Sequence, residues 1–174
     1  CRKAGNRSCK ALREEKEAEL YRMGLSSDDL ALLGTLGSVL PALKTLRLSE
    51  RSGSAGPDGG QLVEGLGVGA LPALTYLLLA DVCVGDAGAS ALAAALDRGA
   101  LPRLKHLDLA ENAIGDAGLV ALAPALRRRP ALETLGLDGN PFSDEGFAAL
   151  VAPPPPAGAP PPTTGGLAKL KDLS

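Results

Sequence analysis

The sequence predicts an α/β solenoid, a right-handed coil in which short parallel strands alternate with helices. A leucine pattern, L-x-x-L-x-L, carries the prediction. It begins at Leu43, Leu74, Leu104 and Leu132, and all twelve of its leucine positions are Leu. The copies start 31, 30 and 28 residues apart, a period typical of repeats that each contribute one strand and one helix. A unit of that size cannot bury its leucines alone, so neighbouring units must stack.

Each copy contains one expected strand followed by one helix. A proline stands two residues before each first leucine and ends the preceding helix, because proline disfavours helix in the residue before it. Aspartates twelve residues after the first leucine, Asp86, Asp116 and Asp144, are placed to cap the helices that begin there. Residues 25–40 have the spacing of the helical half of an earlier unit. The expected strands lie near residues 45–48, 76–79, 106–109 and 134–137.

The segment from Leu104 to Gly118, LKHLDLAENAIGDAG, resembles the ribonuclease-inhibitor-like leucine-rich repeats. The resemblance covers roughly residues 25–151. It implies strands on a concave face and helices on a convex face. The family usually has Asn or Cys eight residues after the first leucine, where the side chain caps backbone groups of the turn. Asn112 and Asn140 fit this rule, whereas Arg51 and Val82 depart from it.

The chain divides into four parts. Residues 1–23 are charged and predict a helical lead-in or linker, with a helix over Lys10 to Arg22. Residues 24–152 form the repeat array, and residues 153–166 are a Pro/Gly-rich loop insertion, with docking of an SH3-like module as the weaker interpretation. Residues 167–174 restart the leucine pattern. We expect both ends to be cut from a longer protein.

Composition excludes several function classes. The net charge of −2 favours neither nucleic acid nor an anionic membrane as a partner, and no apolar run is long enough to cross a bilayer. Three cysteines without a C-x-x-C pair argue against a disulfide scaffold, so we expect a reducing, cytoplasmic setting. Arg127, Arg128 and Arg129 predict a solvated basic helix end.

The sequence contains no pattern that predicts catalysis. His106 is the one histidine, which is too few for a usual zinc site. Neither a nucleophile motif nor a phosphate-binding Gly-rich loop is present. We therefore expect no catalytic residue, metal or cofactor, and no enzyme activity.

Stacked strands place equivalent residues in columns on the concave face. One column is Thr45, Tyr76, His106 and Thr134, and the next is Arg47, Leu78, Asp108 and Gly136. Carboxylates after the strands predict an acidic row beside an apolar centre. Such a face would suit a basic partner protein, although an ordinary hydrated surface is the alternative. The predicted binding residues are Tyr76, Leu78, His106, Asp108, Glu50, Asp81 and Glu111.

Two classes of function fit this pattern. The first is a non-catalytic protein-interaction module, either in a scaffold or as the sensor repeats of a nucleotide-binding receptor. The second is a fragment of a GTPase activator, because the repeats of the Ran GTPase-activating proteins look similar. No functional residue of that second family can be placed on this chain. We therefore favour a module that binds another protein.

Overall fold

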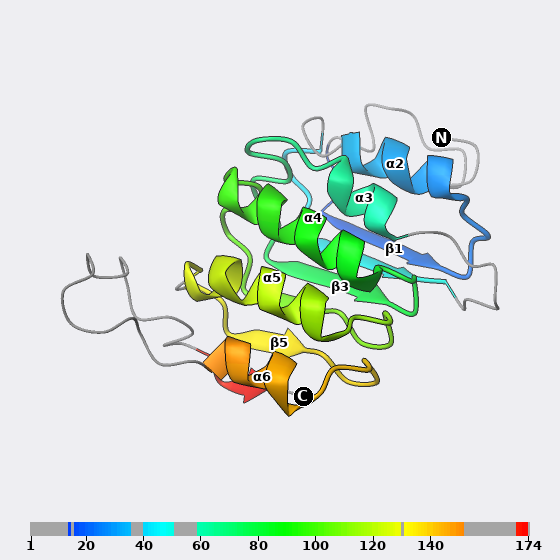
Figure 1. The fold of residues 1–174 in the computed structure, drawn as a ribbon. Coiled ribbons are helices and arrows are strands. Elements are labelled where there is room, and N and C mark those ends of the chain that lie inside the picture. Colours follow the sequence, from blue (N-terminus) through cyan, green and yellow to red (C-terminus); the bar gives the residue numbers. More distant parts are fainter. Residues whose placement is uncertain are drawn as a thin grey trace.

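A computed structural model places six strands in one parallel sheet, in chain order from β1 to β6 (Figure 1). The structure describes residue 14 and residues 16–35, 40–50, 59–129, 131–151 and 170–173. The strands are β1 (Glu17–Tyr21), β2 (Thr45–Ser49), β3 (Tyr76–Ala80), β4 (His106–Asp108), β5 (Thr134–Gly136) and β6 (Asp172–Leu173).

One helix follows each of the first five strands, and all five lie on the same side of the sheet (Figure 1). Each helix packs on the helix of the next unit in the chain. A unit is therefore one strand with the helix that follows it. The helices are α2 (Ser27–Thr35), α3 (Gly60–Glu64), α4 (Gly85–Asp97), α5 (Asp116–Arg127) and α6 (Asp144–Val151).

The leucine columns form the core between the sheet and the helices. Leu46 pairs with Leu77, which pairs in turn with Leu107 and then Leu135. Each of these side chains is at most 6% exposed. Burying a leucine side chain contributes roughly 2 kcal/mol, so the column is a major part of the stability. The four strands expected from the leucine pattern are thus confirmed, with ends that differ by one residue.

The helix expected over Lys10 to Arg22 is wrong for residues 17–21, which form the strand β1. Leu20 pairs with Leu48 and packs against the core, while Glu17 and Glu19 are exposed. This alternation is that of a strand. The leucine repeat did not predict this strand, because β1 has only the third leucine of L-x-x-L-x-L. The sheet therefore begins before residue 24, the start expected for the array.

Two asparagines, the buried Asn112 and the half-buried Asn140, join the turns of neighbouring units. The Asn112 side chain accepts hydrogen bonds from the backbone N–H groups of Val82 and Val84, and donates to the Leu79 carbonyl at 2.5 Å. Asn140 repeats the arrangement one unit later, accepting from the N–H groups of Asn112 and Ile114. The expectation that these asparagines cap the turn is confirmed, and most of the groups they cap belong to the preceding unit.

The aspartates at the helix starts also act between units, which corrects the expectation that Asp86 and Asp116 cap their own helices. Asp86 Oδ1 accepts from Gly115 N at 2.7 Å and Gly118 N at 3.0 Å, at the start of α5. Asp116 accepts from the N–H groups of Ser143 and Gly146 at the start of α6. These bonds lower the pKa of Asp116. Each aspartate therefore caps the next helix.

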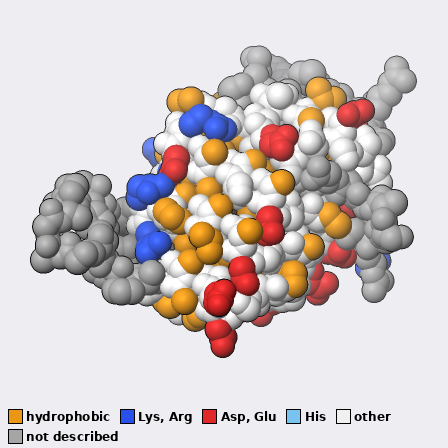
Figure 2. All heavy atoms as spheres, in the orientation of Figure 1, with side chains coloured by type: hydrophobic (Ala, Val, Ile, Leu, Met, Phe, Trp, Pro, Cys, Tyr) orange, Lys and Arg blue, Asp and Glu red, His pale blue; other side chains and the backbone are white. Residues whose placement is uncertain are grey.

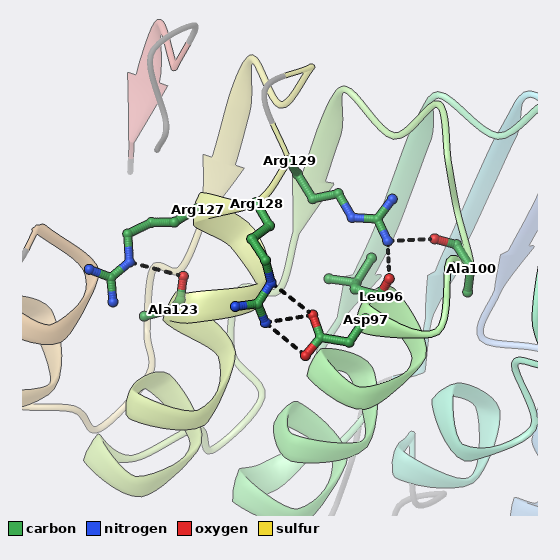
Figure 3. Close-up of polar contacts among 7 residues, drawn as sticks. All are labelled: Leu96, Asp97, Ala100, Ala123, Arg127, Arg128 and Arg129. Carbon is green, nitrogen blue, oxygen red and sulfur yellow. Dashed lines mark hydrogen bonds and ion pairs between the residues drawn. The ribbon is translucent and has the colours of Figure 1, made fainter. Parts of the chain in front are cut away.

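Arginines make a third set of links, at the C-terminal ends of the helices (Figure 3). Arg128 forms a two-pronged ion pair with Asp97 of α4, with N–O distances of 2.6 and 2.8 Å. Arg129 donates to the carbonyls of Leu96 and Ala100. The expected solvated basic end is thus partly wrong, because two of the three arginines bind the preceding unit.

The last strand is held by an ion-paired carboxylate. Glu133, beside β5, contacts Lys171 Nζ at 2.7 Å and Lys105 Nζ at 3.2 Å. β6 pairs in register with β5, with Leu135 opposite Leu173. The Pro/Gly-rich segment that precedes it, residues 153–166, lies outside the described residues.

The Glu133 ion pairs predict a pH-dependent contribution to stability. Hydrogen bonds from Lys171 and then Lys105 lower the pKa of Glu133 to about 2. A carboxyl group whose pKa falls on folding stabilises the folded state at pH values above its pKa in the unfolded chain, about 4.3. This stabilisation is lost as the pH falls toward 2. The free energies of chemical unfolding of the wild type and of Glu133→Gln should therefore differ at pH 7 and converge near pH 2. Glu111→Gln, on an exposed carboxylate, is the control. A difference that stays constant with pH would contradict the assignment.

Candidate functional site

The sheet has one face covered by helices and an opposite face, here called the open face, that no described helix covers (Figure 1). Alternate strand residues point to it. Those of β2 to β4 are half-buried, whereas those of β1 are exposed. The expected columns are in register, because Tyr76 pairs with His106 and Leu78 with Asp108. The open face comprises Thr45, Arg47, Tyr76, Leu78, His106, Asp108 and Thr134.

A charged pair flanks the aromatic centre of the open face. Arg47 Nη1 lies 2.5 Å from Glu19 Oε1 of β1, and the Arg47 guanidinium carbon lies 5.1 Å from the centroid of the Tyr76 ring. The hydrogen bond to Glu19 raises the pKa of Arg47. A cation over an aromatic face is attracted by the electrons of the ring. Arg47 therefore holds one side of Tyr76 in place.

His106 holds the other side of Tyr76. The two rings have centroids 5.6 Å apart and are tilted by 33°. His106 Nδ1 is 3.1 Å from Thr134 Oγ1 on the next strand. Side chains from five successive strands, Glu19 through Thr134, are therefore linked across the sheet. A surface whose side chains are already ordered loses less conformational entropy when a partner binds.

Leu78 and Asp108 form the neighbouring column. Asp108 Oδ1 accepts a hydrogen bond from Ala110 N at 3.0 Å. On the next strand, a Cβ at Gly136 would come within 2.9 Å of that oxygen, so a side chain there would displace Asp108. The structure therefore brings together four of the predicted binding residues: Tyr76, Leu78, His106 and Asp108.

The acidic row is only partly present. Glu111 is exposed and Asp81 is half-buried, and both occupy turns with positive φ, at 54° and 55°. Glu50 does not join them, which corrects the prediction that it is exposed. It is 5% exposed, and its carboxylate accepts from the N–H groups of Met23 and Gly24, with a longer contact to Leu25 N.

Glu50 replaces the asparagine that is missing from this unit. Its Oε1 accepts hydrogen bonds from the N–H groups of residues 23 and 25, just as Asn112 Oδ1 accepts them from residues 82 and 84. Arg51, at the usual asparagine position, lies outside the described residues. The sequence did not predict this role because Glu50 lies one position before the usual asparagine position and has a longer side chain than asparagine. Glu50 is therefore a structural residue.

Two residues of the candidate surface were missed entirely. Glu19 and Tyr21 lie on β1, a segment that was expected from the sequence to be a helix. Tyr21 is 48% exposed and lies at the strand position that pairs with Ser49. The alternation of apolar and polar residues from Glu17 to Tyr21 was the signal that could have found them.

The described residues offer no site for a metal ion. No group of three or more His, Cys, Asp or Glu side chains among them is placed to hold one. In the part of the chain that the structure describes, none of the helices is both long and apolar enough to cross a membrane.

Comparison with known proteins supports the fold class. A family model described as a leucine rich repeat matches residues 101–123, the segment that contains β4 and the start of α5. The match supports a leucine-rich-repeat protein, and the parallel strands alternating with helices fit that fold. Repeats of this kind usually act as non-catalytic modules that bind other proteins. No curated protein matches the chain.

The different burial of Glu50 and Glu111 generates a stability prediction. Glu50→Ala should destabilise the protein by about 3 kcal/mol, because it leaves the N–H groups of Met23, Gly24 and Leu25, in a partly buried turn, without their acceptor. Glu111→Ala, the matched control on the exposed carboxylate, should change stability by less than about 0.5 kcal/mol. Glu50→Gln, which keeps one acceptor oxygen, should fall between the two. Denaturant unfolding measures all three, and equal effects of the two alanine variants would show that Glu50 is not a cap.

Proposed function

We propose that this chain is a non-catalytic interaction module of the ribonuclease-inhibitor-like subfamily. Its units form a right-handed solenoid, and the open face is the concave surface that binds another protein in the cytoplasm. The observation that supports this most directly is the linked row from Glu19 through Arg47, Tyr76 and His106. These side chains come from successive strands, are held by one another, and remain partly exposed.

The chemistry of the open face favours a partner with both apolar and basic groups. Tyr76 and Leu78 supply apolar surface at the centre. Asp108, Asp81 and Glu111 supply negative charge at the end of the strands where the chain leaves the sheet. Aromatic anchors tend to dominate binding energy, whereas charges at the rim mainly set the association rate. We therefore assign affinity to Tyr76 and steering to the carboxylates.

The binding test compares variants of the two faces. The full chain is immobilised, incubated with cytoplasmic extract, and the captured proteins are quantified by mass spectrometry. A partner of the open face should be lost with Tyr76→Ala and with Leu78→Asp, and retained with Val120→Glu on the helical face. Thermal melting of each variant checks that it is folded. Captured proteins that respond equally to all three variants would contradict binding at the open face.

Kinetics with the captured partner then separate the two roles. Tyr76→Ala should weaken the equilibrium affinity roughly 30-fold, mainly through faster dissociation. Glu111→Lys combined with Asp81→Lys should instead slow association and remove most of its salt dependence. Unchanged kinetics in both variants would move the site away from the open face.

A further inference from the structure

The helical side of the sheet carries a surface that the proposed function does not use. Along α4, α5 and α6, the exposed positions between the helix ends hold no charged residue. Val120 and Val151 are 51% and 57% exposed. The outer face of a helix in a soluble protein is usually polar. The surface, here called the helical patch, includes Ala94, Ala117, Val120, Pro124, Phe147 and Val151.

Charges border the helical patch on two opposite edges. The helices begin with carboxylates, at Asp86 of α4, Asp116 of α5, and Asp144 with Glu145 of α6. Arginines stand where α4 and α5 end, at Arg98, Arg127 and Arg128, and Asp97, the last residue of α4, lies among them in its ion pair with Arg128, so the net charge of this edge is positive. Figure 2 shows apolar side chains gathered over these helices, with Lys and Arg along one edge and Asp and Glu toward the other. The patch is thus apolar at its centre and opposite in charge at its two edges.

We propose that the helical patch binds a second copy of this chain, with the helices of the two copies antiparallel. The arrangement is a two-fold dimer whose axis runs along the direction in which the units stack and passes over the middle of α5. Each patch is then its own partner, as a two-fold interface requires. Val120 lies near the axis.

The charges select this orientation. Antiparallel helices place the arginine edge of one copy over the carboxylate edge of the other, on both sides of the axis. They also oppose the helix dipoles favourably, since the negative end of one helix lies beside the positive end of its counterpart. The other two-fold arrangement, with parallel helices, would place carboxylates over carboxylates and arginines over arginines. The small residues Ala94 and Ala117 allow the helices of the two copies to approach closely.

The size of the helical patch predicts a weak dimer. Three helices about 9 Å apart, each about 18 Å long, present roughly 500 Å² per copy. A standard interface buries about 800 Å² per partner, so this one belongs with the weak, transient class. The dimer should therefore form only at high protein concentration, on the order of 100 µM.

Sedimentation of the full chain over a range of concentrations tests the proposal. The expected result is a monomer at low concentration and a dimer at the highest. Val120→Glu, which places a charge at the centre of the patch, should weaken dimerisation at least about tenfold. Val68→Glu is the matched control, because Val68 is 79% exposed on the loop after α3, outside the patch. Ala117→Glu serves as a second disrupting variant if Val120→Glu melts early.

Reversing the charge of the arginine edge tests the orientation. Arg98→Glu with Arg127→Glu leaves the pair of Arg128 with Asp97 intact. In the antiparallel dimer the new carboxylates lie over Asp86 and Asp116 of the other copy, so dimerisation should weaken at least about tenfold. In the parallel arrangement they would lie away from those aspartates, and dimerisation would not weaken. A protein that stays monomeric at all concentrations would overturn the proposal, as would a dimer unaffected by Val120→Glu or by the arginine reversal.

Discussion

Side chains that satisfy the backbone of a neighbouring unit are the interaction on which the rest of the structure depends. Stacked strands pair their own backbone groups, but the turns that follow them leave N–H and carbonyl groups without partners inside the protein, which is costly. Asn112 and Asn140 satisfy those groups in the preceding unit, and Glu50 does so at the first turn. Asp86 and Asp116 act in the other direction, on the helix that follows. Because each bond crosses between units, a unit is complete only when its neighbours are present.

The same coupling fixes the two surfaces to which functions are assigned. Turns held in register keep the strands in register, so Arg47, Tyr76 and His106 lie side by side on the open face. Helix starts held by aspartates keep α4, α5 and α6 adjacent, so their apolar outer positions merge into one patch. Figure 2 shows apolar side chains gathered over these helices, with white atoms between them. A partner on the open face and a second copy on the helical patch would therefore occupy opposite sides of the sheet.

Much of the fold could be predicted from the sequence because the complete leucine pattern recurs four times, at intervals of 28 to 31 residues, and the units can bury these leucines only by stacking. The columns of the open face followed from the same period. The strand at residues 17–21 was missed because Ala18 replaces the second leucine there and the charged residues around it suggest a solvated helix. Glu50 was misplaced because an acidic residue after a strand suggests exposure, and only the three-dimensional arrangement shows the N–H groups of Met23 and Gly24 around it. The aspartates were assigned to the wrong helix because sequence position cannot tell a residue's own helix from the next one in the stack.

Hydrogen exchange on an Asp86→Ala variant tests the coupling between units most directly. Asp86 lies in the first turn of α4, but its carboxylate binds the N–H groups of Gly115 and Gly118 at the start of α5. Loss of that acceptor should accelerate exchange at Gly115 and Gly118 at least about tenfold. Exchange at Gly88, whose N–H binds the Val84 carbonyl within its own unit, should change little. Faster exchange confined to α4, with Gly115 and Gly118 unchanged, would show that the aspartate caps its own helix and would contradict the account.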